Sequence, residues 1–251
     1  MKKSGYTAQE AIITLVIIAI VLTILIPPLL KNTNASQFKT AYKKALSSFK
    51  HAITMNVAVD DFDFRVIHNS STKEDQEHKR SFASIITERL EDSQDITETY
   101  FNNLTGEQSI VVTGEHKCTS EDMQKEAKNY AACTEAGGIN KTIENAKNEY
   151  KLSKDNFIVY HLKDGTAIGY NKHAQDCRKA TQENCVGFID ANGLGGPNRI
   201  TKCDEKGDWK VSCSISAEKI HDIYPVVFYN QTIEPATVAG KSILNGLKGN
   251  K

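Results

Sequence analysis

The chain has 251 residues, of which 39% are apolar and 25% are charged, and this ordinary globular composition excludes disorder along the whole length. Its 31 basic residues balance its 31 acidic residues, so no overall positive field would attract polyanions, and nucleic acid is not an expected partner. The length suits one large domain or two small ones.

The first predicted element is a transmembrane helix over residues 11–30, which carry no charge. A helix of this length rises about 30 Å, the hydrocarbon thickness of a bilayer. We therefore expect a single pass through the inner membrane. A secretory signal removed near Ala35 is the alternative, and lysines on both sides of the run leave the orientation open.

The stretch before this run, residues 2–10, reads KKSGYTAQE. It resembles the leader of type IV pilins and pseudopilins, in which a short basic leader ends in glycine, an aromatic residue follows, and a glutamate stands four residues beyond the aromatic. Tyr6 stands where those proteins more often have phenylalanine, and Ala11 where they often have leucine.

The resemblance implies that residues 1–5 are a leader peptide, that a prepilin peptidase cuts after Gly5, and that the new N-terminal Tyr6 is methylated. It also implies assembly with other pilin or pseudopilin subunits into a filament. An unpaired carboxylate is costly in apolar surroundings, so Glu10 is expected to pair with the Tyr6 amine of an adjacent subunit and thereby fix the register.

A long helix is predicted over residues 6–59. Apolar residues recur at helical spacing from Phe38 to Ile53, with lysines on the other faces. The first half of the helix is apolar all round, whereas the second half has a single apolar stripe. Pro27 and Pro28 predict a kink or melted stretch over residues 22–28.

Residues 60–155 are charged and show mainly helical patterns. A capping box at residues 71–74 precedes apolar residues on one helical face between Phe82 and Leu90. Two further helices are expected over residues 119–133 and 140–151. Together they form a helical connector, similar to the variable region that pilin-like proteins place between the long helix and the sheet.

From Asn156 the pattern changes to that of strands, and Asp164-Gly165 between two β-rich runs predicts a hairpin. More strands are expected over residues 185–189, 209–215 and 223–229, with Pro225 placing the last at an edge or bulge. The expected fold class is α+β: a long N-terminal transmembrane and amphipathic helix packed on a C-terminal antiparallel sheet, residues 156–251, of pilin-like type, with a helical connector.

Six cysteines lie in the C-terminal part of the chain at spacings that lack a Cys-x-x-Cys motif. An even set at irregular spacing favours disulfides in an oxidising compartment over a zinc site. We therefore expect the body to lie outside the cytoplasm. The expected pairs join nearest neighbours, because each closes a short loop: Cys118 with Cys133, Cys177 with Cys185, and Cys203 with Cys213.

A segment rich in aspartate, asparagine and glycine follows the predicted strand at residues 185–189. Asp190, Asn192 and Asp222 could supply oxygen ligands to a calcium ion, the one cofactor that the sequence suggests. In some pseudopilins, which this region resembles, a loop holds calcium. The alternative is a loop held by its own Asx turns, since these residue types also favour such turns.

The seven histidines are dispersed, and the sequence has no hydrolase, metalloprotease or phosphate-loop motif, so no enzyme activity is expected. The expected function is a structural subunit, a minor pilin or pseudopilin of a type IV pilus or type II secretion filament. Two alternatives remain: a membrane-anchored extracytoplasmic enzyme or receptor, and a DNA-uptake competence pilin. The latter would need a basic stripe around Lys172, Arg178 and Lys179.

Overall fold

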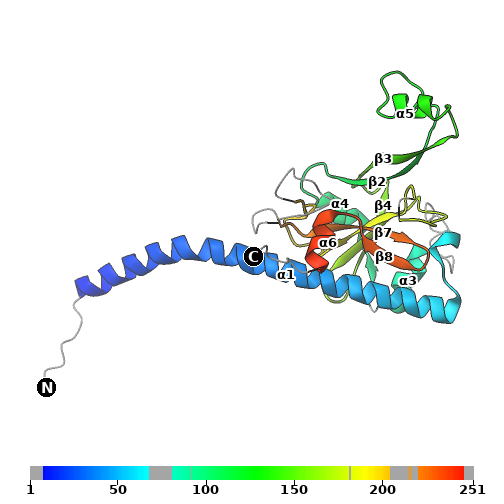
Figure 1. Ribbon diagram of the computed structural model, residues 1–251. Coiled ribbons are helices and arrows are strands. Elements are labelled where there is room, and N and C mark those ends of the chain that lie inside the picture. The colour runs from blue at the N-terminus through cyan, green and yellow to red at the C-terminus, as the bar shows by residue number, and fades with distance from the viewer. Residues whose placement is uncertain are drawn as a thin grey trace.

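The computed structural model describes residues 8–67, 81–90, 92–180, 182–203, 215 and 220–245. Figure 1 shows a long N-terminal helix, α1, whose second half lies along a globular body, and a narrow β-hairpin that projects from the body on the side away from α1. A six-stranded sheet forms the centre of the body. The expected α+β class with an antiparallel sheet is found, but two parts of the expected fold are wrong.

Helix α1 runs from Ala8 to Asp60, close to the predicted helix over residues 6–59. Of the kink or melted stretch expected over residues 22–28, the melted stretch does not form, because the helix continues through Pro27 and Pro28. The helix curves along its length (Figure 1), as long helices commonly do.

The transmembrane part of the expected fold is the first error. Among the residues that the structure describes, no helix combines the length and the apolar character required to cross a membrane. The apolar run is therefore confirmed as part of a helix, whereas the expected membrane span is not found among the described residues.

The second half of α1 packs on the sheet through the stripe that the helical spacing predicted. Its buried side chains are Tyr42, Ala45, Leu46, Phe49, Ala52 and Ile53. They share one apolar core with residues of the short helices η1 (Phe64–Val66), α3 (Phe82–Arg89) and α6 (Val238–Leu244). This burial anchors the second half of α1 to the body.

Neighbouring strands of the large sheet are all antiparallel. In spatial order they are β1 (Gln94–Asp95), β4 (Phe157–His161), β5 (Ala167–Asn171), β6 (Val186–Asp190), β7 (Ile223–Tyr229) and β8 (Thr232–Pro235). The predicted hairpin at Asp164-Gly165 joins β4 to β5, and the predicted strands at 185–189 and 223–229 are confirmed as β6 and β7. Of the strand predicted over residues 209–215, only Ile215 belongs to the described residues.

Pro225 lies in β7, which is not an edge strand, because β8 covers its outer side. Both faces of the sheet are buried. Along β4, Ile158 and Tyr160 face the core that contains α1, whereas Phe157 and Val159 face a second core. The second core lies under α4 (Thr97–Asn102) and the base of the projecting hairpin, so successive strand residues are all apolar rather than alternating.

The helical connector is the second error. The predicted helix over residues 140–151 is a strand, β3 (Thr142–Lys151), which pairs along its length with β2 (Ser109–Lys117) to form the projecting hairpin. Ile143, Ala146 and Tyr150 have helical spacing, but β2 offers an extended partner that satisfies the backbone of β3. Such long-range pairing overrides local preference. The capping box at residues 71–74 lies outside the described residues, and Ser81 caps α3 instead.

The helix predicted over residues 119–133 is also wrong, because the region is mostly turns and only α5 (Tyr130–Glu135) is helical. Cys118 and Cys133 form a disulfide with a Cα–Cα distance of 5.7 Å. A continuous helix between them would hold their Cα atoms about 22 Å apart, at about 1.5 Å of rise per residue. The disulfide and a helix along this segment therefore exclude each other.

Candidate functional site

The first candidate region is the N-terminal half of α1. Gly5 and Tyr6, the predicted processing residues, lie outside the described residues. Glu10 lies in the first turns of α1, and its side chain is outside the described part. Seven large apolar side chains between residues 12 and 20 are each 52–66% exposed, namely Ile12, Ile13, Leu15, Val16, Ile17, Ile18 and Ile20. A contiguous apolar surface of this kind marks an interaction site.

The second candidate region contains the predicted calcium ligands. Asp190 ends β6 and Asp222 immediately precedes β7, and the backbone N–H of Ala191 donates to the Asp222 carbonyl at 2.9 Å. Antiparallel pairing therefore brings the two aspartates together although they are far apart in sequence. Both are fully buried, so each carboxylate depends on protein partners.

Five hydrogen bonds reach these two carboxylates. Asp190 accepts from the Tyr100 hydroxyl at 2.6 Å and from the backbone N–H groups of Asn192 and Gly193 at 3.1 and 3.0 Å. Asp222 accepts from the N–H groups of Asn198 and Arg199 at 2.8 and 2.7 Å. The bonds from Asn192 and Gly193 to Asp190 are those that the Asx-turn interpretation predicts. The other three join distant parts of the chain, and together the five hold the loop after β6 in place.

The electrostatics of the pair are unfavourable when both groups are charged. Burial and the nearby Asp222 carboxylate raise the pKa of Asp190 to about 7, against the opposing hydrogen bonds from Tyr100, Asn192 and Gly193. Burial also raises the pKa of Asp222. Two further oxygens, the side-chain Oδ1 atoms of Asn192 and Asn198, are buried and accept no hydrogen bond from the described residues. A cation bound at this loop would offset the repulsion between the two carboxylates and would give the two amide oxygens a partner. Calcium binding therefore stays a prediction.

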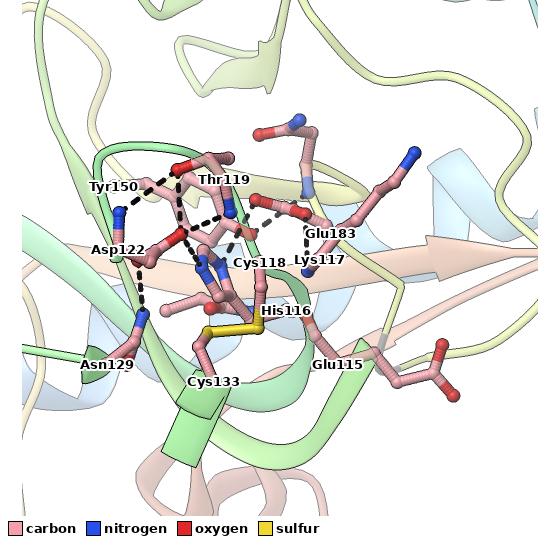
Figure 2. Close-up of polar contacts among 12 residues, drawn as sticks. Glu115, His116, Lys117, Cys118, Thr119, Asp122, Asn129, Cys133, Tyr150 and Glu183 are labelled. Carbon is pink, nitrogen blue, oxygen red and sulfur yellow. Dashed lines mark hydrogen bonds and ion pairs between the residues drawn. A yellow bond between two sulfur atoms is a disulfide. The ribbon is translucent and has the colours of Figure 1, made fainter. Parts of the chain in front are cut away.

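A third cluster lies at the end of the projecting hairpin, and Figure 2 shows its side chains. His116 of β2 lies between two carboxylates, with Nε2 at 2.9 Å from Asp122 Oδ2 and Nδ1 at 3.5 Å from Glu183 Oε1. A neutral imidazole carries a single N–H, so only the imidazolium can donate toward both carboxylates.

Asp122 is held firmly in its ionised form. Burial would raise the pKa of this carboxyl, but hydrogen bonds from the N–H and hydroxyl of Thr119 and from His116 outweigh burial and keep the pKa well below its usual range. The Thr119 hydroxyl donates to Asp122 rather than to His116. This geometry is not a hydroxyl–imidazole–carboxylate relay, in which the hydroxyl would face the imidazole.

Sequence reasoning missed this cluster, because the histidines are dispersed and Glu183 is distant along the chain. Cys133 lies close to His116 and Asp122, but in the oxidised protein its sulfur is bonded to Cys118. The nearest-neighbour pairing is confirmed here and for Cys177 with Cys185. Cys203 is also disulfide-bonded, and its predicted partner, Cys213, lies outside the described residues.

Two of the basic residues that could form a DNA-binding stripe are paired with carboxylates. Arg178 contacts Asp176 at 2.7 Å, and Lys179 contacts Glu115 at 2.7 Å. Their charges are locally balanced, so these two residues do not add to a stripe that would attract a polyanion.

Comparison with known proteins gave no family: no family model, curated protein or solved structure matches the chain significantly.

Proposed function

We propose that the protein is a structural subunit of a pilin-like filament, a minor pilin or pseudopilin of a type IV pilus or type II secretion system. The observation that carries this proposal is the division of α1 into two parts. The second half is packed on the sheet, whereas the first half projects from the body (Figure 1) with seven exposed apolar side chains.

An apolar helix that projects into solvent gains free energy when it packs against other apolar helices. Copies of the same helix, side by side, would bury this surface and leave the globular bodies outside. The N-terminal pattern of residues 2–10 supports the same assignment, since cleavage after Gly5 would leave a new amine one helical turn from Glu10. Pairing of Glu10 with the Tyr6 amine of a neighbouring subunit would then select one register.

The disulfides support an extracytoplasmic body. Two are described in full, and Cys203 takes part in another. Such bonds form and persist in oxidising compartments and are rare in the cytosol. This location agrees with a filament subunit whose globular part faces outward.

The decisive experiment is the intact mass of the protein purified from cells that contain a prepilin peptidase. The expected mass lacks residues 1–5 and carries one added methyl group. A bulky residue in place of Gly5 should leave the precursor uncut. A wild-type protein that keeps residues 1–5 in the presence of the peptidase would contradict the proposal.

A second experiment tests assembly. Glu10→Gln should abolish or slow incorporation into filaments while the purified body keeps its melting temperature, because the change removes a charge without altering shape. Gln9→Ala is the matched control, since it alters the neighbouring residue and leaves the carboxylate in place. Normal incorporation of Glu10→Gln would show that no ion pair sets the register.

A further inference from the structure

Four potential metal ligands meet at the end of the β2–β3 hairpin. A ring nitrogen of His116, an Asp122 carboxylate oxygen and Cys133 Sγ all lie within 4.8 Å of one another. Cys118 Sγ adds a fourth ligand atom, because it is bonded to Cys133 Sγ at 2.05 Å. Imidazole, carboxylate and two thiolates are the ligand types that Zn²⁺ takes in tetrahedral sites.

The surroundings of these groups are those of a metal site (Figure 2). A histidine that binds a metal through one nitrogen usually directs the other nitrogen at a carboxylate, and here Nδ1 of His116 faces Glu183 at 3.5 Å. A metal-bound carboxylate is usually held by hydrogen bonds as well. Asp122 accepts from Thr119 at 2.8 Å and from the Asn129 amide at 3.4 Å.

We propose that reduction of the Cys118–Cys133 disulfide creates a zinc site formed by His116, Asp122, Cys118 and Cys133, and that oxidation of the two cysteines abolishes it. The inference is independent of the proposed filament function. In the oxidised chain the sulfur atoms are bonded to each other and cannot act as thiolates. The same four side chains therefore serve two alternative states of one loop.

The required movements are small. The edge of a tetrahedral zinc site is about 3.3 Å between nitrogen and oxygen and about 3.8 Å between two sulfurs, from the usual ligand distances. His116 Nε2 and Asp122 Oδ2 are already 2.9 Å apart. The sulfurs must move apart from their bonded distance, which breaking the bond permits.

The chemistry balances with a phosphine as reductant. The disulfide, one phosphine and one water give two thiols and one phosphine oxide, so the phosphorus is oxidised by two electrons and the sulfurs are reduced. Zn²⁺ then displaces the two thiol protons and the proton on Nε2, which pass to the solvent. On reoxidation by a disulfide reagent, the two thiolates give up two electrons, which reduce the reagent's S–S bond to two thiolates; the Cys118–Cys133 bond forms and zinc is released.

The chain supplies a matched control. Cys177 and Cys185 form a second short-range disulfide, and both sulfurs lie near the Gln175 carbonyl at 3.8 Å. Within the described residues, only the cluster at His116 brings three or more metal-ligating side chains together. If two adjacent thiols are sufficient to bind zinc, both cysteine pairs should bind it with similar affinity. If the histidine and the aspartate are also required, tight binding should occur at Cys118 and Cys133 and be absent at Cys177 and Cys185.

The test is a Zn²⁺ titration of the full-length chain, fully reduced by the phosphine, in competition with a chromogenic chelator. We expect one tightly bound zinc in the reduced wild type and none in the oxidised protein. Cys118→Ser and His116→Asn should lower the zinc affinity by about 100-fold or more, and Glu183→Gln by about 10- to 100-fold. The double variant Cys177→Ser/Cys185→Ser should bind zinc as the wild type does.

Co²⁺ in place of Zn²⁺ provides a second readout, because thiolate-to-cobalt absorption reports bound sulfur directly even if a variant folds less well. Equal zinc loss in the Cys118→Ser and the Cys177→Ser/Cys185→Ser proteins would overturn the proposal. If both His116→Asn and Glu183→Gln bind zinc as tightly as the wild type does, the two thiols alone bind the metal and the proposed four-ligand site is wrong. Tight zinc binding by the oxidised protein, or none by the reduced protein, would also overturn it.

Discussion

Tyr42 of α1 stacks on Tyr224 of β7, with ring centroids 4.2 Å apart and an interplanar angle of 18°. Both rings are fully buried, so this pair links the long helix to strand β7 of the sheet. Offset aromatic pairs of this kind contribute about 0.5–1.5 kcal/mol beyond the burial of their area.

Removal of the Tyr42 ring should destabilise the body strongly. We expect Tyr42→Ala to lower the free energy of unfolding by about 3–5 kcal/mol, measured by urea denaturation. Tyr42→Phe should cost little, because the hydroxyl is buried without a described hydrogen-bond partner. Lys43→Ala, on the exposed side of the same turn, is the control. A large loss in Tyr42→Phe would show that the hydroxyl has a partner.

Gly169 of β5 lies against Phe188 of β6, and a Cβ atom at Gly169 would lie 2.3 Å from the phenylalanine ring. Gly169→Ala should therefore destabilise the sheet by about 1–3 kcal/mol through overpacking. The double variant with Phe188→Leu should recover part of the loss, since the smaller side chain leaves room. Additive losses in a double-mutant cycle would show that the two positions do not interact.

Asp190 should make the protein less stable as pH rises. Its folded pKa of about 7 lies above the ordinary value of 3.8, so the folded state binds more protons than the unfolded state between these pH values. The stabilisation is complete below about pH 4 and is lost as pH rises through about 7, by an amount on the order of a few kcal/mol. Asp190→Asn cannot ionise and should flatten this dependence, measured by urea denaturation at several pH values.

Calcium should remove the same penalty if it binds the loop. An ion near Asp190, Asn192 and Asp222 would offset the charge of the buried pair and stabilise the folded state by mass action. We expect the melting temperature at neutral pH to rise with calcium, to fall with a chelator, and to be unresponsive in Asp190→Asn. Magnesium is the control ion. If melting is indifferent to calcium in the wild type, hydrogen bonds alone hold the loop.

The Cys118–Cys133 disulfide should stabilise the end of the hairpin rather than the sheet. In the chain-entropy model a loop of this size contributes about 3 kcal/mol. We expect Cys118→Ser/Cys133→Ser to lose amide protection mainly near this loop, where Asn140 donates to the Cys118 carbonyl and Gly138 to the Cys133 carbonyl. Hydrogen exchange measures this directly. Equal loss of protection in β6 and β7 would show instead that the disulfide supports the whole body.

The sequence alone determined the elements whose residues are close together along the chain. The stripe from Tyr42 to Ile53 predicted the packed face of α1, and Asp164-Gly165 predicted the hairpin between β4 and β5. Nearest-neighbour pairing of the cysteines was correct for the two disulfides that are described in full, because short loops close with little loss of entropy. These patterns depend on local spacing, which a single chain displays.

Tertiary structure decided what depends on distant partners. Residues 140–151 are a strand because β2 pairs with them. His116 gains Glu183 from a loop far along the chain, and Asp190 meets Asp222 only through the pairing of β6 with β7. Local periodicity contains no information on such pairings, since they arise when the chain folds back on itself and buries both faces of its sheet.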